Sequence, residues 1–95
     1  MEIIGRKTLH DFKVRHADAC ATLNSWEAEV SATIWKTPQD IKKRYSKASI
    51  LPGNHVIFDV CGNRYRLWVQ IAYKKEVVLI KKIGTHKEYD KWQIK

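Results

Sequence analysis

Residues 55–72, with the sequence HVIFDVCGNRYRLWVQIA, carry the clearest structural signal in this 95-residue chain. On both sides of Gly62-Asn63 the apolar residues recur with a period of two, which is typical of β-strands. A Gly-Asn pair between two such runs favours a tight two-residue turn. We therefore predict a β-hairpin with strands over residues 55–61 and 64–72.

The turn also determines which residues of the hairpin face one another. If Cys61 lies opposite Arg64, one side of the sheet is apolar and must face the core. The pairs on that side are Val60 with Tyr65, Phe58 with Leu67, and Val56 with Val69. The pairs on the other side are Asp59 with Arg66, Ile57 with Trp68, and His55 with Gln70.

A third strand is predicted over residues 77–83, after a turn around Lys74-Lys75. It would pair with the second strand of the hairpin. The expected pairs are Val69 with Ile80 and Ile71 with Val78 on the core side, and Lys81 with Trp68 on the other. Residues 85–88, THKE, fit the S/T-x-x-E capping box, so a short C-terminal helix should begin just after Gly84.

The first half of the chain predicts a short opening strand over residues 2–5 and then helices. Leu9 and Phe12 mark one face of a first helix that ends before His16. A longer helix is expected from Asp18 to about Ile34, because apolar residues recur there at spacings of three or four. Its predicted core stripe is Ala19, Leu23, Trp26, Val30 and Ile34. The segment TPQD at residues 37–40 predicts the start of a third helix, which would bury Ile41 and Tyr45.

Composition and charge narrow the class of protein. The chain suits one domain, 44% of its residues are hydrophobic, and its net charge is +8. Residues 30–95 hold fourteen Lys and Arg against five Asp and Glu, a net of +9, whereas residues 1–29 carry −1. This asymmetry favours binding to a polyanion such as RNA, although a merely solubilising basic surface would look similar.

Several other classes of protein are disfavoured. No apolar run is long enough for a membrane span and no signal peptide is recognisable, so we expect a cytoplasmic protein. Cys20 and Cys61 are too few and too far apart for a metal site or a disulfide framework, and we expect two reduced thiols. The chain has no phosphate-binding loop, no dinucleotide fingerprint and no zinc motif, so neither a cofactor nor a metal is expected.

Four segments resemble a known family: GNRYRL (residues 62–67), GTHKEYDK (84–91), GRKTL (5–9) and WKTP (35–38). Together they are similar to the HigB family of toxins from bacterial toxin–antitoxin pairs, within the RelE-like superfamily. The resemblance implies an α+β fold with a small, mainly antiparallel sheet, N-terminal helices packed on one face and a short C-terminal helix. It also implies an endoribonuclease that cuts mRNA on the translating ribosome, and a cognate antitoxin (HigA-like) that resembles a helix-turn-helix protein.

The resemblance also singles out residues for the site. It points to Asn63, Arg66, His86, Glu88, Tyr89 and Asp90. Of these we assign Arg66, His86 and Tyr89 to catalysis. The residues expected to contact RNA are Asn63, Arg64, Trp68, Lys81, Lys82 and Lys87.

The chain departs from the family pattern at some positions. Cys61 stands where a small residue, often glycine, is expected. Compared with RelE toxins, His86 replaces an arginine, and Ile57 and Asp59 lie on the strand that supplies lysines there. The division of chemical roles can therefore differ from that of RelE.

The chemistry of RNA cleavage without a metal explains why these residue types matter. A base must take the proton of the 2′-hydroxyl, a cation must stabilise the phosphate, and an acid must protonate the leaving oxygen. Arg66 offers a planar, permanently charged guanidinium for the phosphate. An imidazole such as that of His86 can both accept and donate a proton, which suits the role of base or acid, while Tyr89 can donate a proton or stack on a base.

Each assignment has a structural alternative. Arg66 can simply form a cross-strand ion pair with Asp59, and His86 can simply occupy the first turn of a capped helix. Glu88 is more consistent with the reciprocal cap. Tyr89 and Trp92 can be the apolar edge by which the last helix docks. Trp68 can pack under a helix or loop instead of binding a base. The cluster of Lys42, Lys43 and Arg44 can be a solvated face rather than a contact to ribosomal RNA. Two other functions also remain open, a noncatalytic RNA-binding module and a related toxin that acts on a protein such as gyrase.

Overall fold

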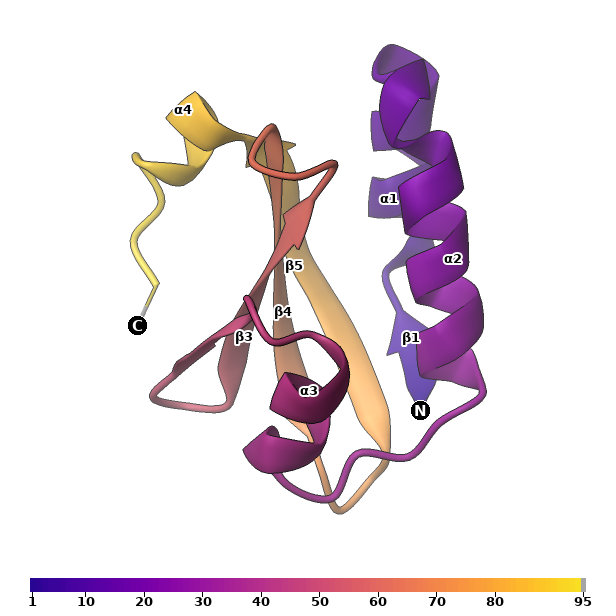
Figure 1. Ribbon diagram of the computed structural model, residues 1–95, viewed down its shortest axis with the longest axis vertical. Helices are drawn as coiled ribbons and strands as arrows, with labels where there is room; N and C mark the ends of the chain where they lie inside the picture. Colours follow the sequence, from indigo (N-terminus) through magenta and orange to yellow (C-terminus); the bar gives the residue numbers. More distant parts are fainter. Residues whose placement is uncertain (95) are drawn as a thin grey trace.

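A computed structural model describes residues 1–94 and shows one curved five-stranded sheet with three helices on one face (Figure 1). The strands are β1 (Glu2–Ile4), β2 (Ser49–Leu51), β3 (His55–Val60), β4 (Tyr65–Ala72) and β5 (Val77–Thr85). The helices are α1 (Arg6–Arg15), α2 (Cys20–Ser31), α3 (Pro38–Arg44) and α4 (His86–Tyr89), with a 3-10 turn at Ala17–Ala19. The predicted α+β fold is confirmed.

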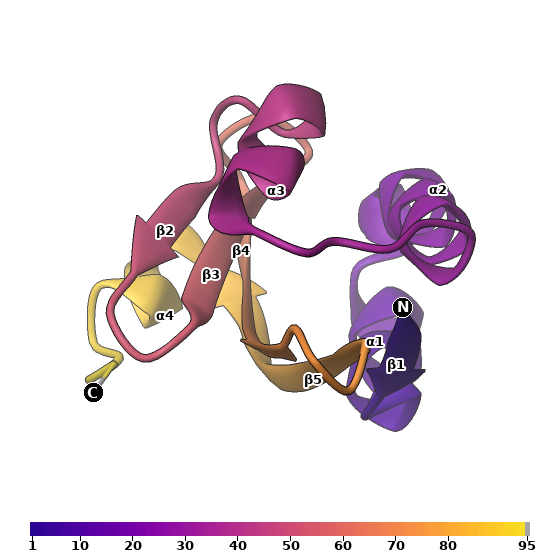
Figure 2. The same ribbon diagram turned by 90° about the horizontal axis from the view of Figure 1, so that it is seen from below.

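The strand order is β1-β5-β4-β3-β2. All neighbours are antiparallel except β1, which pairs in parallel with β5 and closes that edge of the sheet. Helices α1, α2 and α3 pack on one face, whereas α4 and the tail lie on the other side of β3 and β4 (Figure 2). None of the helices in residues 1–94 has the length and apolar character that crossing a bilayer requires.

The predicted register of the hairpin is confirmed at all six pairs, from His55 opposite Gln70 to Val60 opposite Tyr65. The connection differs from the predicted two-residue turn, because β3 ends at Val60 and β4 begins at Tyr65. The backbone angle φ is positive at Cys61 (53°) and at Gly62 (67°). Glycine reaches positive φ without a steric penalty, which explains why glycine is favoured at the position of Cys61.

The pairing of β4 with β5 is confirmed on the core side and wrong by one residue on the other. Val69 faces Ile80 and Ile71 faces Val78, as expected. A β-bulge between Trp68 and Val69 then places Lys82, not Lys81, opposite Trp68. A bulge inserts one extra residue into a strand, and the alternation of apolar residues in the sequence does not reveal it. Beyond the bulge, the pairing of β5 with β4 continues to Thr85, which lies opposite Tyr65.

The helix α2 is shorter than predicted. It ends at Ser31, where the N–H of Ala32 donates to the carbonyls of Ala28 and Glu29. Ile34 therefore lies beyond the helix and is 52% exposed, so its placement on the core stripe was wrong. The other members of the stripe are buried as predicted. The three-residue edge strand β2 was not predicted, because so short a segment carries no periodic signal.

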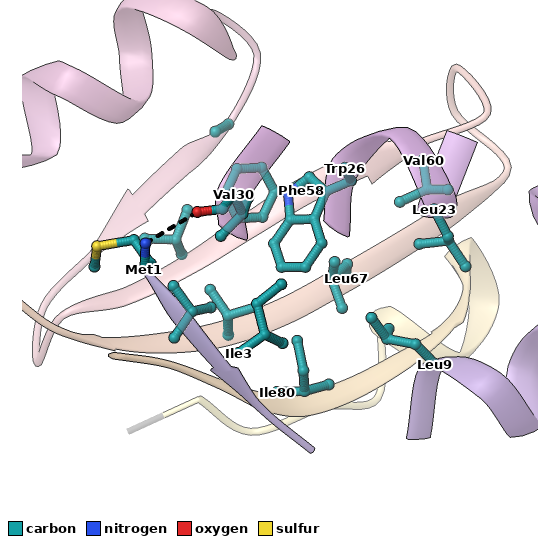
Figure 3. Close-up of a cluster of buried hydrophobic side chains, with 14 of the residues drawn as sticks. Met1, Ile3, Leu9, Leu23, Trp26, Val30, Phe58, Val60, Leu67 and Ile80 are labelled. Atoms are coloured by element: carbon teal, nitrogen blue, oxygen red, sulfur yellow. Dashed lines mark hydrogen bonds between the residues drawn. The ribbon is translucent and has the colours of Figure 1, made fainter. Parts of the chain in front are cut away.

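The core lies between the helices and the sheet (Figure 3). Phe58 on β3 is 2% exposed. Three aromatic rings pack on it, one from α2 and two from the segments that flank α3: Trp26, Trp35 and Tyr45. The ammonium group of Met1 donates to the carbonyl of Val30, 3.1 Å away at the end of α2. The first strand and α2 are thus held together by a cation at the negative end of a helix as well as by apolar contacts.

Two members of the predicted α2 stripe, Leu23 and Ile34, provide a test of this core. Leu23→Ala should lower the free energy of unfolding by about 2–5 kcal/mol, because Leu23 is fully buried and its loss leaves a cavity. Ile34→Ala, the matched aliphatic control, should change it by less than about 1 kcal/mol, because half of Ile34 already contacts water. Urea unfolding measures both values, and equal losses would contradict the described end of α2.

Candidate active site

Arg66 lies on the face of β4 away from α1, α2 and α3 and is held by the hairpin tip. Its Nη2 group donates to Oδ1 of Asn63 at 2.7 Å, and its Nη1 group donates to the main-chain oxygen of Asn63 at 3.3 Å. Its Nε atom lies 3.3 Å from Oδ1 of Asp59. The cross-strand ion pair is therefore present, and only 10% of the Arg66 side chain remains exposed.

Tyr89 connects Arg66 to the C-terminal helix. The guanidinium carbon of Arg66 lies 5.6 Å from the centre of the Tyr89 ring. The imidazole of His86 lies 6.3 Å from the same ring, and its Nδ1 atom is 3.4 Å from Oδ2 of Asp90. Arg66 from β4 and His86 from α4 thus both lie beside the ring of Tyr89, the third residue predicted for catalysis.

The helix α4 begins where it does because of a capping box. The main-chain N–H of Thr85 donates to Oε1 of Glu88 at 2.9 Å, and the N–H of Glu88 donates to Oγ1 of Thr85 at 3.2 Å. The hydrogen bond from the Thr85 main chain lowers the pKa of Glu88. The interpretation of Glu88 as the reciprocal cap is confirmed.

Gly84 allows α4 to lie close against the sheet. It faces Arg66 across β4 and β5. A Cβ atom at this position would lie 3.1 Å from the Glu88 side chain and 3.1 Å from Cζ2 of Trp92. Any other residue would therefore push away both the cap and the indole, and the glycine that begins the GTHKEYDK motif has a steric function.

Trp68 is packed rather than open. It is 7% exposed, its Nε1 group donates to Nδ1 of His55 at 3.0 Å, and its ring lies 6.0 Å from that of Trp92. The ammonium group of Lys81 lies 5.9 Å from the same ring. Packing against the C-terminal segment, one of the two alternatives for Trp68, is the arrangement present, and little of this indole is accessible to a base.

The main-chain carbonyl of Arg64 accepts from the N–H of His86 at 3.1 Å, but its guanidinium pairs with a residue outside this group. Its Nη1 atom is 2.6 Å from Oδ2 of Asp18, and the hydroxyl of Tyr65 donates to the same carboxylate. These contacts, with the Tyr65 hydroxyl as the larger cause, lower the pKa of Asp18. Arg64 therefore ties the hairpin to the turn before α2.

The predicted lysines are on the surface. Lys81, Lys82 and Lys87 are all exposed. In the cluster on α3, Lys42 donates to the carbonyls of Ser46 and Ala48, and Arg44 pairs with Glu29. Two of these three α3 cations thus have structural partners.

Two features of the site were missed in the sequence. One is that Asn63 accepts two hydrogen bonds from Arg66; an Asn three residues before an Arg at a hairpin tip is compatible with such a contact but does not require it. The other is the contact between Trp92 and Trp68, which joins residues on different elements and leaves no local signal. Within residues 1–94, no three His, Cys, Asp or Glu side chains are grouped so that they could hold a metal ion.

Comparison with known proteins gives a consistent result. The family model described as HigB toxin, the RelE-like toxic component of a toxin–antitoxin system, matches residues 19–92. The mRNA interferase toxin HigB of Escherichia coli strain K12 is 24% identical over 92 residues, which are 95% of this chain and 88% of that protein. The mRNA interferase HigB of Shigella flexneri is similar to the same extent.

The α4 cap should make stability depend on pH in a defined direction. Because the pKa of Glu88 is lowered by folding, its contribution is present above the pKa of an unfolded glutamate, about 4.3, and is lost as the pH falls through the folded value. We expect the parent to be more stable than Glu88→Gln at pH 7, and the difference to shrink below pH 4. Urea unfolding across this range measures it, and a difference that grows toward acid pH would contradict the cap.

Proposed function

The chain belongs to the HigB family of RelE-like toxins, and from this premise we propose that it is an mRNA interferase that cuts mRNA on the translating ribosome. The curated relatives are named as mRNA interferases, which supports the same activity here. The observation that carries the proposal is that Arg66 and His86 lie beside the same ring, that of Tyr89, on a basic protein. A guanidinium can stabilise charge on a phosphate, and an imidazole and a phenol can transfer protons, which are the steps that metal-free phosphodiester cleavage needs.

In this proposal Arg66 stabilises the negative charge that grows on the phosphate. Its ion pair with Asp59 is the contact that an incoming phosphate would replace, since Nε faces that carboxylate. Asn63 and the main chain would keep the guanidinium plane in position during this exchange. A charge that is already oriented needs little reorganisation when the transition state forms.

His86 is proposed as the general base or general acid. Its side chain is 48% exposed, so it can exchange protons with solvent and reach a bound strand. With Nδ1 beside Asp90, the Nε2 atom is left to act on the substrate, in the way that a carboxylate orients a catalytic imidazole. Tyr89 lies between the two groups, where its hydroxyl can donate a proton or its ring can contact a base.

The remaining predicted residues would bind the strand. Lys81, Lys82 and Lys87 are exposed near the site and suit contacts to flanking phosphates. Asn63 can donate to RNA through its amide nitrogen while its oxygen accepts from Arg66. Arg64 would require release from Asp18 before it could contribute. As a toxin of this family, the protein is proposed to have a cognate helix-turn-helix antitoxin and to act in the cytoplasm.

The central experiment adds purified protein to a translation extract and maps the ends of the mRNA. The parent should produce new ends within translated messages. Arg66→Ala and His86→Ala should each lower the cleavage rate by about 100-fold or more, because each removes a group that acts in the transition state. Lys75→Ala, an exposed cation in the turn before β5, is the control and should cleave like the parent.

The outcomes separate the competing functions. Salt-sensitive RNA binding without new mRNA ends would favour a noncatalytic RNA-binding module. Intact messages together with DNA damage in expressing cells would favour a toxin that acts on a protein such as gyrase. Full cleavage by both alanine variants would contradict the roles proposed for Arg66 and His86.

The contact between Asn63 and Arg66 gives a separate prediction. Asn63→Ala removes the oxygen that accepts from Nη2 at 2.7 Å, so the guanidinium loses one of its restraints. We expect kcat to fall by about tenfold and KM to change less, since orientation matters most in the transition state. Steady-state cleavage measurements test this, and an effect on KM alone would indicate a role for Asn63 in RNA contact only.

A further inference from the structure

We propose that Trp92 is the stacking platform of a nucleobase-binding subsite beside Arg66, an inference that rests on the proposed function. Trp92 lies after α4 and is half-buried. The sequence favoured Trp68 for this role, but Trp68 is enclosed between its neighbours. The subsite would take a single-stranded RNA base next to the scissile phosphate.

The first argument is a continuous strip of aromatic and cationic side chains on the open side of the sheet. The strip consists of Lys81, Trp68, Trp92, Tyr89 and Arg66. Successive members lie 5.9, 6.0, 5.7 and 5.6 Å apart, measured to the ring centres. Interleaved cations and rings are the surface that single-stranded nucleic acids use, because phosphates bind the cations and bases stack on the rings.

The second argument is that the Trp92 ring is held in place. Trp68 backs it at 35° between ring planes, and Tyr89 meets it edge-on at 85°. Gly84 leaves the space that Cζ2 of Trp92 occupies. Trp68 is itself fixed by its hydrogen bond to His55. A base that stacks on such a ring finds a surface that is already ordered, so little conformational entropy is lost on binding.

The third argument is the position of the ring relative to the proposed chemistry. Tyr89 contacts both Trp92 and Arg66. A base on Trp92 would therefore belong to a nucleotide directly next to the phosphate at Arg66. Lys82, which faces Trp68, and the exposed Lys91, which precedes Trp92, could hold the backbone of that strand. Stacking selects for an unpaired base rather than for a particular sequence.

The test must separate stacking from simple docking of α4. The probe is a short single-stranded RNA with 2′-O-methyl groups, which lacks the attacking hydroxyl and cannot be cleaved. Trp92→Leu keeps an apolar side chain against Trp68 but has no aromatic face, whereas Trp92→Phe keeps one. Trp26→Phe, in the core, is the matched tryptophan control.

We expect Trp92→Leu to bind the probe about tenfold more weakly, and Trp92→Phe and Trp26→Phe to bind it within about threefold of the parent. Binding should quench tryptophan fluorescence in the parent and in Trp26→Phe, and much less in Trp92→Phe. Far-UV circular dichroism and urea unfolding show whether each variant keeps its fold.

Two results would overturn the subsite. One is unchanged affinity in Trp92→Leu. The other is an equal loss of affinity in Trp92→Leu and Trp92→Phe together with a lower free energy of unfolding in both, which would assign Trp92 to docking alone. If the subsite is right but the nuclease proposal is wrong, the results differ from both of these. Probe binding would then still depend on Trp92, but no new mRNA ends would appear in the translation extract.

Discussion

The pairing of β3 with β4 in a single register is the constraint on which the rest of the structure depends. It directs Phe58 and Leu67 toward the helices and Asp59 and Arg66 to the opposite face. Because side chains alternate along a strand, a slip of one residue would exchange the two sets. The core would then contain an ion pair and the candidate site would contain phenylalanine. Stability and candidate chemistry are therefore set by the same hydrogen-bonded ladder.

The second element of the site is the way β5 ends. At Gly84 the strand lies opposite Arg66, and the next residue begins a helix through its capping box. The chain consequently turns back over the open face at the level of the guanidinium, and Tyr89 is placed against it. A short helix of this kind has little stability of its own, so its position depends on the cap and on packing of Trp92 against Trp68.

The structural and functional interpretations of these residues are compatible. Arg66 forms the ion pair with Asp59 and also faces Tyr89, so the same contacts that hold it are those that would orient it toward a phosphate. For Glu88 we assign a structural role only, as the cap of α4. Trp92 is half-buried and packs against Trp68, so a structural role for it is present and a binding role would be compatible with its exposure. In a chain of this size few residues lie outside the core and its support, so a functional surface shares residues with the fold.

The sequence by itself determined the features that depend on local spacing: the hairpin register, the start of α3 at Thr37-Pro38, the capping box that starts α4, and the positions of most buried helix residues. The tertiary structure alone decided the bulge that moves Lys82 opposite Trp68, the early end of α2 that leaves Ile34 exposed, the parallel pairing of β1, and the burial of Trp68 under Trp92. These depend on contacts between residues far apart in the chain. Periodicity reports which face of an element is apolar, but the partner that covers that face is selected by the packing of the whole molecule.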